Sequence, residues 1–526
     1  QTNDSKRRGF MNSKRAGNIM IQGTASSVGK SLICTGLCRV FKQDGYRVAP
    51  FKSQNMALNS YITKDGLEMG RAQAMQAEAA GVEPSVEMNP ILLKPTADAN
   101  AQVIINGVAQ GNMSAVKYHY SKPKLAAMLK DIYEGLAKKY DIIVLEGAGS
   151  PAEINLRDRD IVNMGMAEIA NAPVVIVGDI DKGGVFASLA GTMLLLTEEE
   201  RARVKGVIIN KFRGDINLLK PGLKMLEDII KVPVLGVLPY IKLNLDDEDG
   251  HLDERFARRY SDGKSDIDIA VVRLPHISNY TDFSALENIP SVSVRYVDSP
   301  DQFSRPDMII LPGTSNTIGD LLAIRSAGIE QHIKKLNSKG IPVFGICGGY
   351  QMLGKEIEDP DRIESPEPLV KGMGLLDMKI IYRKEKIATQ VQAVVTDGSG
   401  FFEGLENMVV NGYEIHMGVN EFLGNCFPFL SVKEMSGESS SKIGGVRNKE
   451  GNVFGTYIHG LFNKDEFALG FINNLRKRKG LKPLDQNWRS YKDFIEEEYD
   501  RLAEMIRANL NMKAIYDIVN SQNLRG

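Results

Sequence analysis

The sequence predicts an α/β protein with two doubly wound domains, and three observations lead to this expectation. At 526 residues the chain is too long for one hydrophobic core. Short apolar runs rich in β-branched residues alternate with helical patterns, which is typical of parallel sheets covered on both faces. The alternation occurs twice, on either side of a polar stretch over residues 243–265 that we interpret as a linker.

The first alternating region, residues 18–242, should form one domain with a parallel sheet. Residues 1–17 before it are polar and basic, and we expect a disordered tail there. Helices are expected over 31–41 and 219–230. The expected strands cover residues 18–24, 46–51, 141–146, 172–178, 204–210 and 232–238.

The second alternating region, residues 266–464, should form another domain of the same class. Residues 316–336 contain the helical patterns, and residues 379–432 look β-rich and antiparallel. The remaining residues, 465–526, are expected to form an amphipathic helical extension that carries Trp488. The expected strands cover residues 267–274, 292–297, 308–311 and 341–346.

Composition excludes several classes of protein. The net charge of −1 provides no long-range field for nucleic acid or anionic lipid. No apolar run reaches the roughly 18 residues of a membrane span, and the basic opening has no signal-peptide pattern. Four cysteines are too few for a disulfide framework. We therefore expect a cytoplasmic protein without nucleic-acid or membrane partners, and the sequence leaves a homo-oligomer open.

A glycine-rich turn after the first expected strand has the composition of a phosphate-binding loop. Gly23 and Thr24 begin it, and Gly29, Lys30 and Ser31 end it. The helix that follows would point its N-terminus at an anion, Lys30 would neutralise phosphate charge, and Ser31 would hold Mg²⁺. The common loop has four residues between its glycines and this one has five. The alternative is a glycine-rich turn with an exposed lysine.

That five-residue spacing resembles dethiobiotin synthetase and its relatives. The resemblance implies that Lys52, just after the second strand, approaches the phosphates, and that Glu146, which ends a strand before Gly147, binds Mg²⁺. A solvated strand end is the alternative for Lys52. Asn210 resembles a base-reading position. The second acidic metal ligand, with Glu68 and Asp98 as candidates, stays open.

Cys347 lies between glycines after an apolar strand, in a pattern that resembles a nucleophile elbow. The glycines permit a strained turn, and the following helix favours thiolate. We expect N–H donors for an oxyanion at Gly348 and near Gly313, and the general base at His459, with His416 in a supporting or structural position. The alternative for Cys347 is a small buried apolar residue.

These residues resemble a class I glutamine amidotransferase domain. Many such domains have a glutamate two residues after the histidine, where this chain has Leu461. We therefore hypothesise a Cys–His pair whose ring is weakly oriented, with slow or substrate-gated glutamine hydrolysis.

The order of the two domains resembles the cobyric acid synthase group, over about residues 18–462. The runs that look specific to it are residues 50–60, 93–96, 179–186 and 273–283. The resemblance implies amidation of the b, d, e and g carboxylates of adenosylcobyrinic acid a,c-diamide, with ATP and Mg²⁺ as cofactors and glutamine and the corrinoid as substrates. Substrate contacts are expected from Asn55, Asp179, Asp181 and Lys182.

Two other hypotheses about the function stay open. One is another glutamine-dependent amide synthetase of the same build, such as cobyrinate a,c-diamide synthase. The other is a non-catalytic phosphate-loop ATPase switch with a decayed second domain, which the presence of both Cys347 and His459 disfavours.

Overall fold

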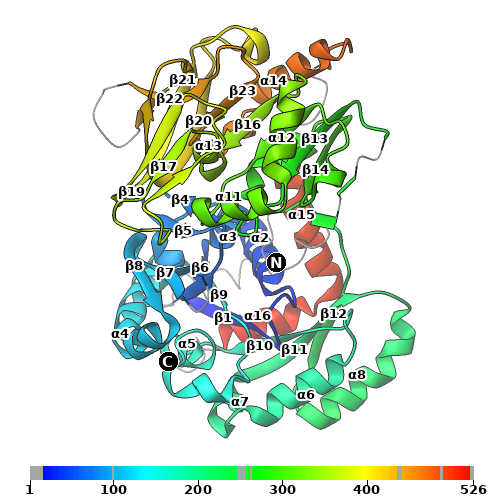
Figure 1. Ribbon diagram of the computed structural model, residues 1–526. Helices are drawn as coiled ribbons and strands as arrows, with labels where there is room; N and C mark the ends of the chain where they lie inside the picture. The colour runs from blue at the N-terminus through cyan, green and yellow to red at the C-terminus, as the bar shows by residue number, and fades with distance from the viewer. Residues whose placement is uncertain are drawn as a thin grey trace.

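The computed structural model describes residues 16–97, 100–245, 256–257, 259–260, 263–434, 441–485 and 490–521. Nearly all of the expected basic tail, much of the expected linker, Asp98 and Trp488 lie outside these residues. Within them the expected α/β class is confirmed: two layered domains, each built on a sheet flanked by helices, lie one above the other (Figure 1).

The first domain is built on a parallel sheet with strand order β12-β11-β10-β1-β9-β2. Every residue of the central strand β1 is buried, because helices cover both faces. The carboxyl ends of the strands meet at one edge, where a ligand crevice is expected. The strands are β1 (Gly17–Gly23), β2 (Val48–Phe51), β9 (Ile142–Glu146), β10 (Val174–Asp179), β11 (Val204–Phe212) and β12 (Val234–Pro239).

Helices α2 and α3 pack against each other beside this sheet. The helices of this domain are α2 (Lys30–Gln43), α3 (Arg71–Ala80), α4 (Ala115–Lys139), α5 (Met164–Ile169), α6 (Val185–Leu195), α7 (Glu198–Arg203) and α8 (Ile216–Ile230). Short 3-10 turns cover Val86–Met88 and Ile154–Arg159.

A smaller sheet that we did not expect from the sequence projects from the first domain towards the second. Its order is β3-β6-β7-β8, and a hairpin of β4 and β5 lies near it (Figure 1). The strands are β3 (Gln54–Met56), β4 (Ser60–Ile62), β5 (Glu68–Gly70), β6 (Ile91–Ala97), β7 (Asn100–Ile105) and β8 (Val108–Ser114).

The second domain has a mixed sheet with the order β14-β13-β15-β16-β23-β22-β21-β19-β17-β18, and β20 pairs with β19. The run from β14 to β23 is parallel, and the β-rich region is antiparallel as expected. The strands are β13 (Ile267–Val272), β14 (Val292–Val297), β15 (Met308–Leu311), β16 (Val343–Ile346), β17 (Glu356–Glu358), β18 (Leu369–Lys371), β19 (Met378–Val395), β20 (Val409–Phe422), β21 (Phe427–Glu434), β22 (Lys442–Arg447) and β23 (Val453–Thr456).

The helices of this domain are α10 (Ser284–Glu287), α11 (Thr317–Ser326), α12 (Ile329–Ser338), α13 (Gly348–Met352) and α14 (Asp465–Arg478). Short 3-10 turns cover Tyr280–Phe283, Pro300–Gln302, Gly400–Phe402 and Leu461–Asn463. Phe471 of α14 packs edge-on to Phe454 of β23 with ring centroids 6.0 Å apart, so α14 belongs to the core of the second domain.

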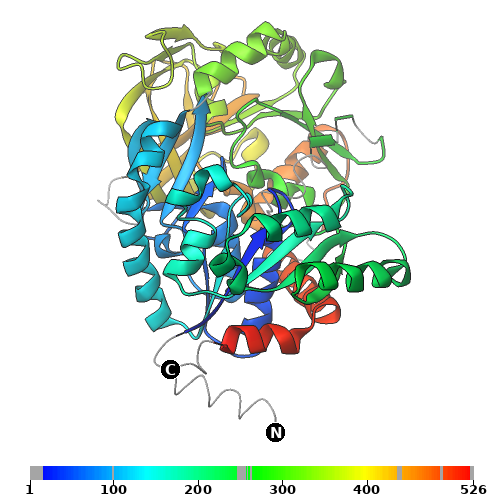
Figure 2. The same cartoon turned by 90° about the horizontal axis from the view of Figure 1, so that it is seen from below.

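The last two helices, α15 (Tyr491–Asn509) and α16 (Met512–Asn520), return to the first domain. Leu502 and Ile506 are buried against α2, and Leu510 forms a β-bridge with Gly236 of β12. Arg39 of α2 lies 2.7 Å from the Asp500 carboxylate. Figure 2 shows these helices beside the first strand of the chain. The expected helical extension is therefore divided between the two domains.

The two domains contact each other through polar groups on and next to the β4–β5 hairpin. The Asn59 side chain accepts a hydrogen bond from the Asn279 amide at 2.6 Å, and the Tyr413 hydroxyl donates to the Ser60 carbonyl at 3.2 Å. Glu68 forms an ion pair with Lys386 at 2.6 Å.

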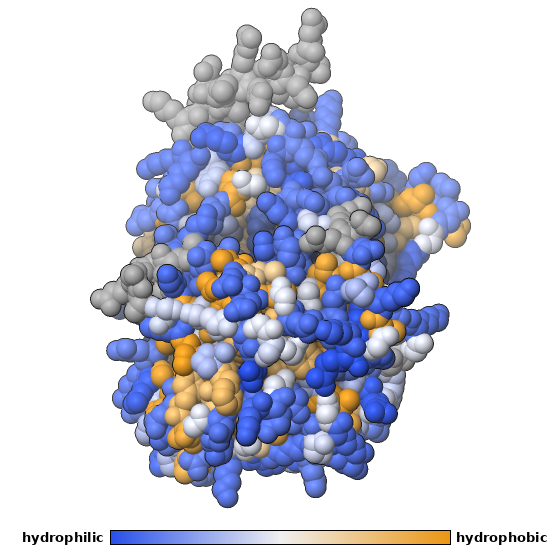
Figure 3. Space-filling view, turned by 90° about the horizontal axis from the view of Figure 1, so that it is seen from above, coloured by the Kyte–Doolittle hydropathy of each residue, from blue (hydrophilic) through white to orange (hydrophobic). Residues whose placement is uncertain are grey.

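None of the helices in the described ranges is both long enough and apolar enough to span a bilayer. The face in Figure 3 presents mostly hydrophilic side chains, with hydrophobic ones in smaller patches between them.

Replacing Leu502 by alanine should destabilise the first domain. The side chain is fully buried between α15 and α2, so the cavity should lower the free energy of unfolding by about 2–5 kcal/mol. Chemical denaturation followed by circular dichroism measures this. The exposed neighbour Glu504 provides the control, Glu504→Ala. Equal stability of both variants would contradict the packing described for α15.

Candidate active sites

Cys347 lies on a strained turn between β16 and α13. Its φ of 51° lies in the left-handed region, which a residue with a side chain seldom occupies without a reason. Its amide donates to the Thr456 carbonyl at 2.9 Å, which ties the turn to β23. A Cβ at Gly349 would collide with the Leu311 carbonyl, so only glycine permits this close crossing. The turn places the thiol at the carboxyl end of the parallel strands.

His459 follows β23 and is buried, and its ring is held by a carboxylate. Nδ1 lies 2.7 Å from Oδ2 of Asp282, and Oδ1 of the same residue accepts the Gly460 amide at 2.8 Å. Our hypothesis of a weakly oriented ring is therefore wrong. Leu461, which replaces the expected glutamate, is buried in the core, and Asp282 from a distant segment orients the ring instead.

The same carboxylate changes the acidity of the ring. Burial lowers the pKa of His459, but the Asp282 carboxylate and the Cys347 thiol outweigh burial and raise it to about 10. Because the pKa is raised, stabilisation from this pair is complete below the ordinary histidine pKa and is lost as the pH rises through about 10. With Nδ1 engaged by Asp282, Nε2 is the nitrogen left to exchange a proton with Cys347.

Two tyrosines pack on the histidines of this region. The Tyr413 ring stacks on His459 at 5.2 Å, and the Tyr457 ring stacks on His416 at 3.6 Å. Nδ1 of His416 lies 2.7 Å from the Gly418 carbonyl. A Cβ at Gly313 would lie 3.1 Å from Cε1 of His459, so this glycine leaves the ring its space. Gly348 begins α13, one residue beyond the thiol.

A cavity of about 350 Å³ surrounds Cys347 and His459. The second domain contributes most of its lining, including Gly348 and His416. The small sheet of the first domain contributes Lys94, Gln102 and Asn112. The thiol cavity is therefore formed by both domains.

The expected phosphate loop follows β1 and leads into α2. Gly29 has a φ of 98°, and its left-handed conformation lets the loop turn into the helix. The side chain of Asn210 donates to the Val28 carbonyl at 2.9 Å, so Asn210 braces the loop from β11. The Lys30 ammonium donates to the Ala25 carbonyl at 2.9 Å and lies over the loop. Gly23 and Thr24 form its entrance.

Glu146 is the centre of a buried polar cluster beside this loop. Its carboxylate accepts hydrogen bonds from Ser31 at 2.8 Å, from Lys52 at 2.8 Å and from Gln76 at 2.6 Å. Burial alone would raise the pKa of Glu146, but Lys52, Gln76 and Lys30 hold it below its usual value. An ionised carboxylate beside a serine hydroxyl is a donor set that fits Mg²⁺.

The second acidic metal ligand is not supplied by Glu68, because this carboxylate is bound between Lys94 and Lys386. Burial opposes its ionisation, but the two lysines lower its pKa to about 2. Within the described ranges we find no cluster of three or more His, Cys, Asp or Glu side chains that could hold a metal ion.

A cavity of about 390 Å³ lies next to the phosphate loop. Lys30, Lys52 and Asn55 line it together with Gly149. The other expected substrate residues lie at the end of β10. Asp179 forms an ion pair with Lys211 at 3.1 Å, Asp181 forms one with Arg213 at 2.9 Å, and Lys182 is exposed.

Comparisons with known proteins agree over almost the whole chain. Residues 19–251 match the model of the CobQ/CobB/MinD/ParA nucleotide binding domain, and residues 268–467 match that of the CobB/CobQ-like glutamine amidotransferase domain. The chain is 56% identical to the cobyric acid synthase of Thermoanaerobacter sp. (strain X514), over 95% of this chain and 98% of the relative. It is 55% identical to that of Clostridium tetani (strain Massachusetts / E88), with the same shares covered.

The chain belongs to the cobyric acid synthase family. The resemblance inferred from its motifs is thereby confirmed.

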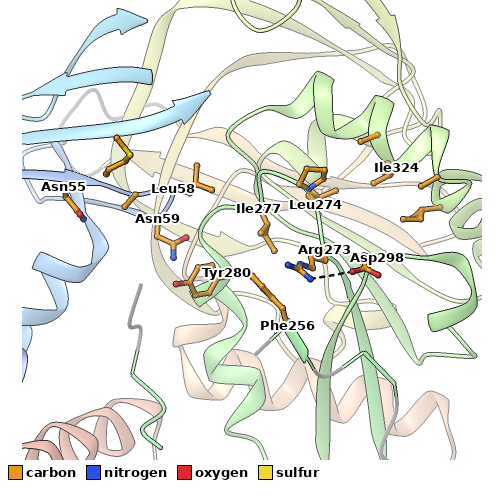
Figure 4. A pocket seen from close by; sticks show the side chains of 16 residues that line it. Asn55, Leu58, Asn59, Phe256, Arg273, Leu274, Ile277, Tyr280, Asp298 and Ile324 are labelled. Carbon is orange, nitrogen blue, oxygen red and sulfur yellow. Dashed lines mark ion pairs between the residues drawn. The ribbon is translucent and has the colours of Figure 1, made fainter. Parts of the chain in front are cut away.

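In this member of the cobyric acid synthase family, a third cavity of about 630 Å³ lies between the two domains. Asn55 and Met56 line both this cavity and the one beside the phosphate loop. Figure 4 shows Tyr280 and Phe256 on one side and Leu274 and Ile324 on another. Most of the lining is apolar, with Arg273 and Asp298 as an ion pair at 3.6 Å.

Two residues of this family member were missed from the sequence. Asp282 lies in the run 273–283, which was noted for its resemblance to the family but not for an acid. Gln76 lies within a helix whose small and polar residues gave no signal. The expectation that a buried histidine needs a hydrogen-bond partner is the signal that could have identified Asp282 in the run 273–283.

Replacing Asp282 by asparagine should lower the pKa of His459 and impair glutamine hydrolysis. We expect the rate to fall by about 100-fold or more, the usual range for losing an oriented general base. Ammonia release from glutamine at several pH values measures both effects. The exposed Asp301 provides the control, Asp301→Asn. Unchanged hydrolysis in Asp282→Asn would contradict the orienting role.

Replacing Glu146 by glutamine should impair the first domain alone. The neutral amide is a poorer metal ligand and leaves the buried Lys52 without its carboxylate, so ammonia-driven amidation should fall by about 100-fold or more. Glutamine hydrolysis without nucleotide should stay within about twofold of wild type. The exposed Glu199→Gln is the matched control. Equal loss of both activities would indicate general misfolding instead.

Proposed function

We propose that the chain amidates the b, d, e and g carboxylates of adenosylcobyrinic acid a,c-diamide, using ATP and glutamine. The observation that carries this proposal is the similarity to curated cobyric acid synthases, which extends over both domains. A chain that retained only one of the two activities would be expected to resemble them over one domain.

Glutamine would be cleaved in the thiol cavity. Because the pKa of His459 is raised, its ring holds a proton on Nε2 beside a Cys347 thiolate; this thiolate attacks the side-chain amide carbonyl while Asp282 holds the ring. The N–H groups of Gly348 and of the Gly313 turn would donate to the oxyanion. The imidazolium returns the proton to the leaving nitrogen, so ammonia departs and a thioester remains. Water then hydrolyses the thioester to glutamate.

The acid would be activated beside the phosphate loop. A carboxylate is a poor electrophile, so its oxygen first attacks the γ-phosphorus of ATP, and ADP leaves. Lys30 and Lys52 stabilise the negative charge on the transferring phosphoryl group. Ser31 and Glu146 would hold Mg²⁺, which supplies further positive charge at the phosphates. Ammonia then displaces phosphate from the acyl phosphate, and an amide forms.

The corrinoid would lie in the interdomain cavity, with the reacting carboxylate directed past Asn55 towards the phosphate loop. The apolar lining suits the faces of the macrocycle, and Arg273 suits a peripheral carboxylate or amide (Figure 4). Asn55 lines both cavities, so its polar side chain would contact the substrate in this step. Asp179, Asp181 and Lys182 would act at the phosphate end of the site.

The proposal is tested by incubating the protein with ATP, Mg²⁺, glutamine and adenosylcobyrinic acid a,c-diamide. We expect mass spectrometry to detect successive exchanges of OH for NH₂, ending when b, d, e and g are all amides. Cys347→Ala should lose the glutamine-driven reaction and keep the ammonia-driven one. An unchanged corrinoid, with glutamine still hydrolysed, would refute the assigned substrate.

A further inference from the structure

The thiol cavity must accommodate more than an amide, because free glutamine also carries an α-carboxylate and an α-ammonium. Removing either charge from water is costly unless the protein supplies a partner of opposite sign. The cavity lining contains two lysines, Lys94 and Lys386, and one glutamate, Glu364, besides the Cys347–His459 pair and His416.

The two lysines come from different domains and meet at Glu68. Lys386 of β19 lies 2.6 Å from Oε2 of Glu68, and Lys94 of β6 lies 3.1 Å from Oε1. Glu68 is buried and is not among the residues that line the cavity. Among the described residues, the ion pairs of these two ammonium groups share one carboxylate, so this wall of the cavity has one more positive than negative charge in the pairing.

Both lysines are also positioned by neutral partners. The Lys386 ammonium donates to the Gln102 side chain at 2.8 Å, and the Lys94 ammonium donates to Ser60 at 3.2 Å. Burial and the nearby Lys94 lower the pKa of Lys386 although Glu68 acts to raise it, so a further carboxylate beside Lys386 would be stabilising. The wall of the cavity formed by Lys386 and Lys94 is therefore suited to binding an anion.

Glu364 supplies the opposite charge in the same cavity. Oε1 accepts the Tyr382 hydroxyl at 3.0 Å, and Oε2 accepts the Ile318 amide at 3.2 Å. Desolvation raises the pKa of this carboxyl to about 7, and an ammonium ion beside it would favour the ionised form. The same Tyr382 hydroxyl lies 2.9 Å from Oε1 of Gln351, which also lines the cavity.

We propose that Lys386 and Lys94 bind the α-carboxylate of glutamine while Glu364 binds its α-ammonium. The assignment rests on the glutamine-dependent reaction proposed above. It makes the glutamine site a composite one, since Lys94 belongs to the nucleotide-binding domain. Glutamine is then held for attack by Cys347 only while the small sheet of the first domain is docked on the second.

The assignment is tested with variants and with glutamine analogues that each lack one charge. The analogue 4-aminobutanamide lacks the α-carboxylate, and 4-carbamoylbutanoate lacks the α-ammonium. Ammonia release is measured for the full chain without corrinoid. Lys386→Met should lose about 10- to 100-fold in kcat/KM for glutamine and for 4-carbamoylbutanoate, and little for 4-aminobutanamide.

Glu364→Gln should give the opposite pattern, with the loss confined to glutamine and 4-aminobutanamide. Lys386→Arg should restore much of the discrimination, because it keeps the positive charge. The matched control is Lys384→Met on the same strand, whose exposed ammonium pairs with Asp361 at 3.2 Å outside the cavity; it should behave as wild type.

Equal losses for both analogues in either variant would overturn the assignment, because a structural defect does not distinguish them. So would a wild-type enzyme that hydrolyses 4-aminobutanamide as well as glutamine. The corrinoid mass measurement described above tests the proposed function separately, because added ammonia replaces glutamine in that reaction.

Discussion

The buried carboxylate of Asp282 fixes the general base of the thiol site, and its segment joins that site to the first domain. One oxygen holds the ring of His459, and the other holds the backbone of Gly460. Its segment begins at Asn279, whose amide binds Asn59 of the first domain. The segment that orients the general base is therefore also the segment that contacts the nucleotide-binding domain. A shift of one domain relative to the other would therefore displace the ring of His459.

The buried carboxylates at both sites are each held by partners from several elements. Glu146 is surrounded by three donors, from α2, α3 and the residue that follows β2, and Glu68 by two lysines from different sheets. An ionised group out of water is tolerated only when such partners are fixed in place. The polar clusters thus specify the positions of the elements that carry them, and these elements are the walls of the cavities.

The sequence predicted those features that depend on residues close together in the chain, such as strands and glycine-rich turns. Strands β14 and β15 have the bounds expected from apolar runs, and the positions of Cys347 and Glu146 follow from glycines after such runs. It did not predict Asp282 as the partner of His459, because the two lie 177 residues apart and no spacing relates them. It also missed the sheet of β6 to β8, because Ile91, Leu93 and Val103 of β6 and β7 are buried in the first domain whereas β8 is almost entirely exposed, so the three strands share no apolar pattern.

The return of α15 and α16 to the first domain bears on how the protein is made. During synthesis the nucleotide-binding domain emerges first, yet Ile506 and Leu510, which cover its α2 and β12, emerge at the end. Until then the apolar surface of α2 and β12 is exposed to solvent. The second domain, in contrast, can already complete its hydrophobic core with α14. Ribosome-bound chains should therefore complete the amidotransferase half first, and the half translated earlier should depend longest on chaperones.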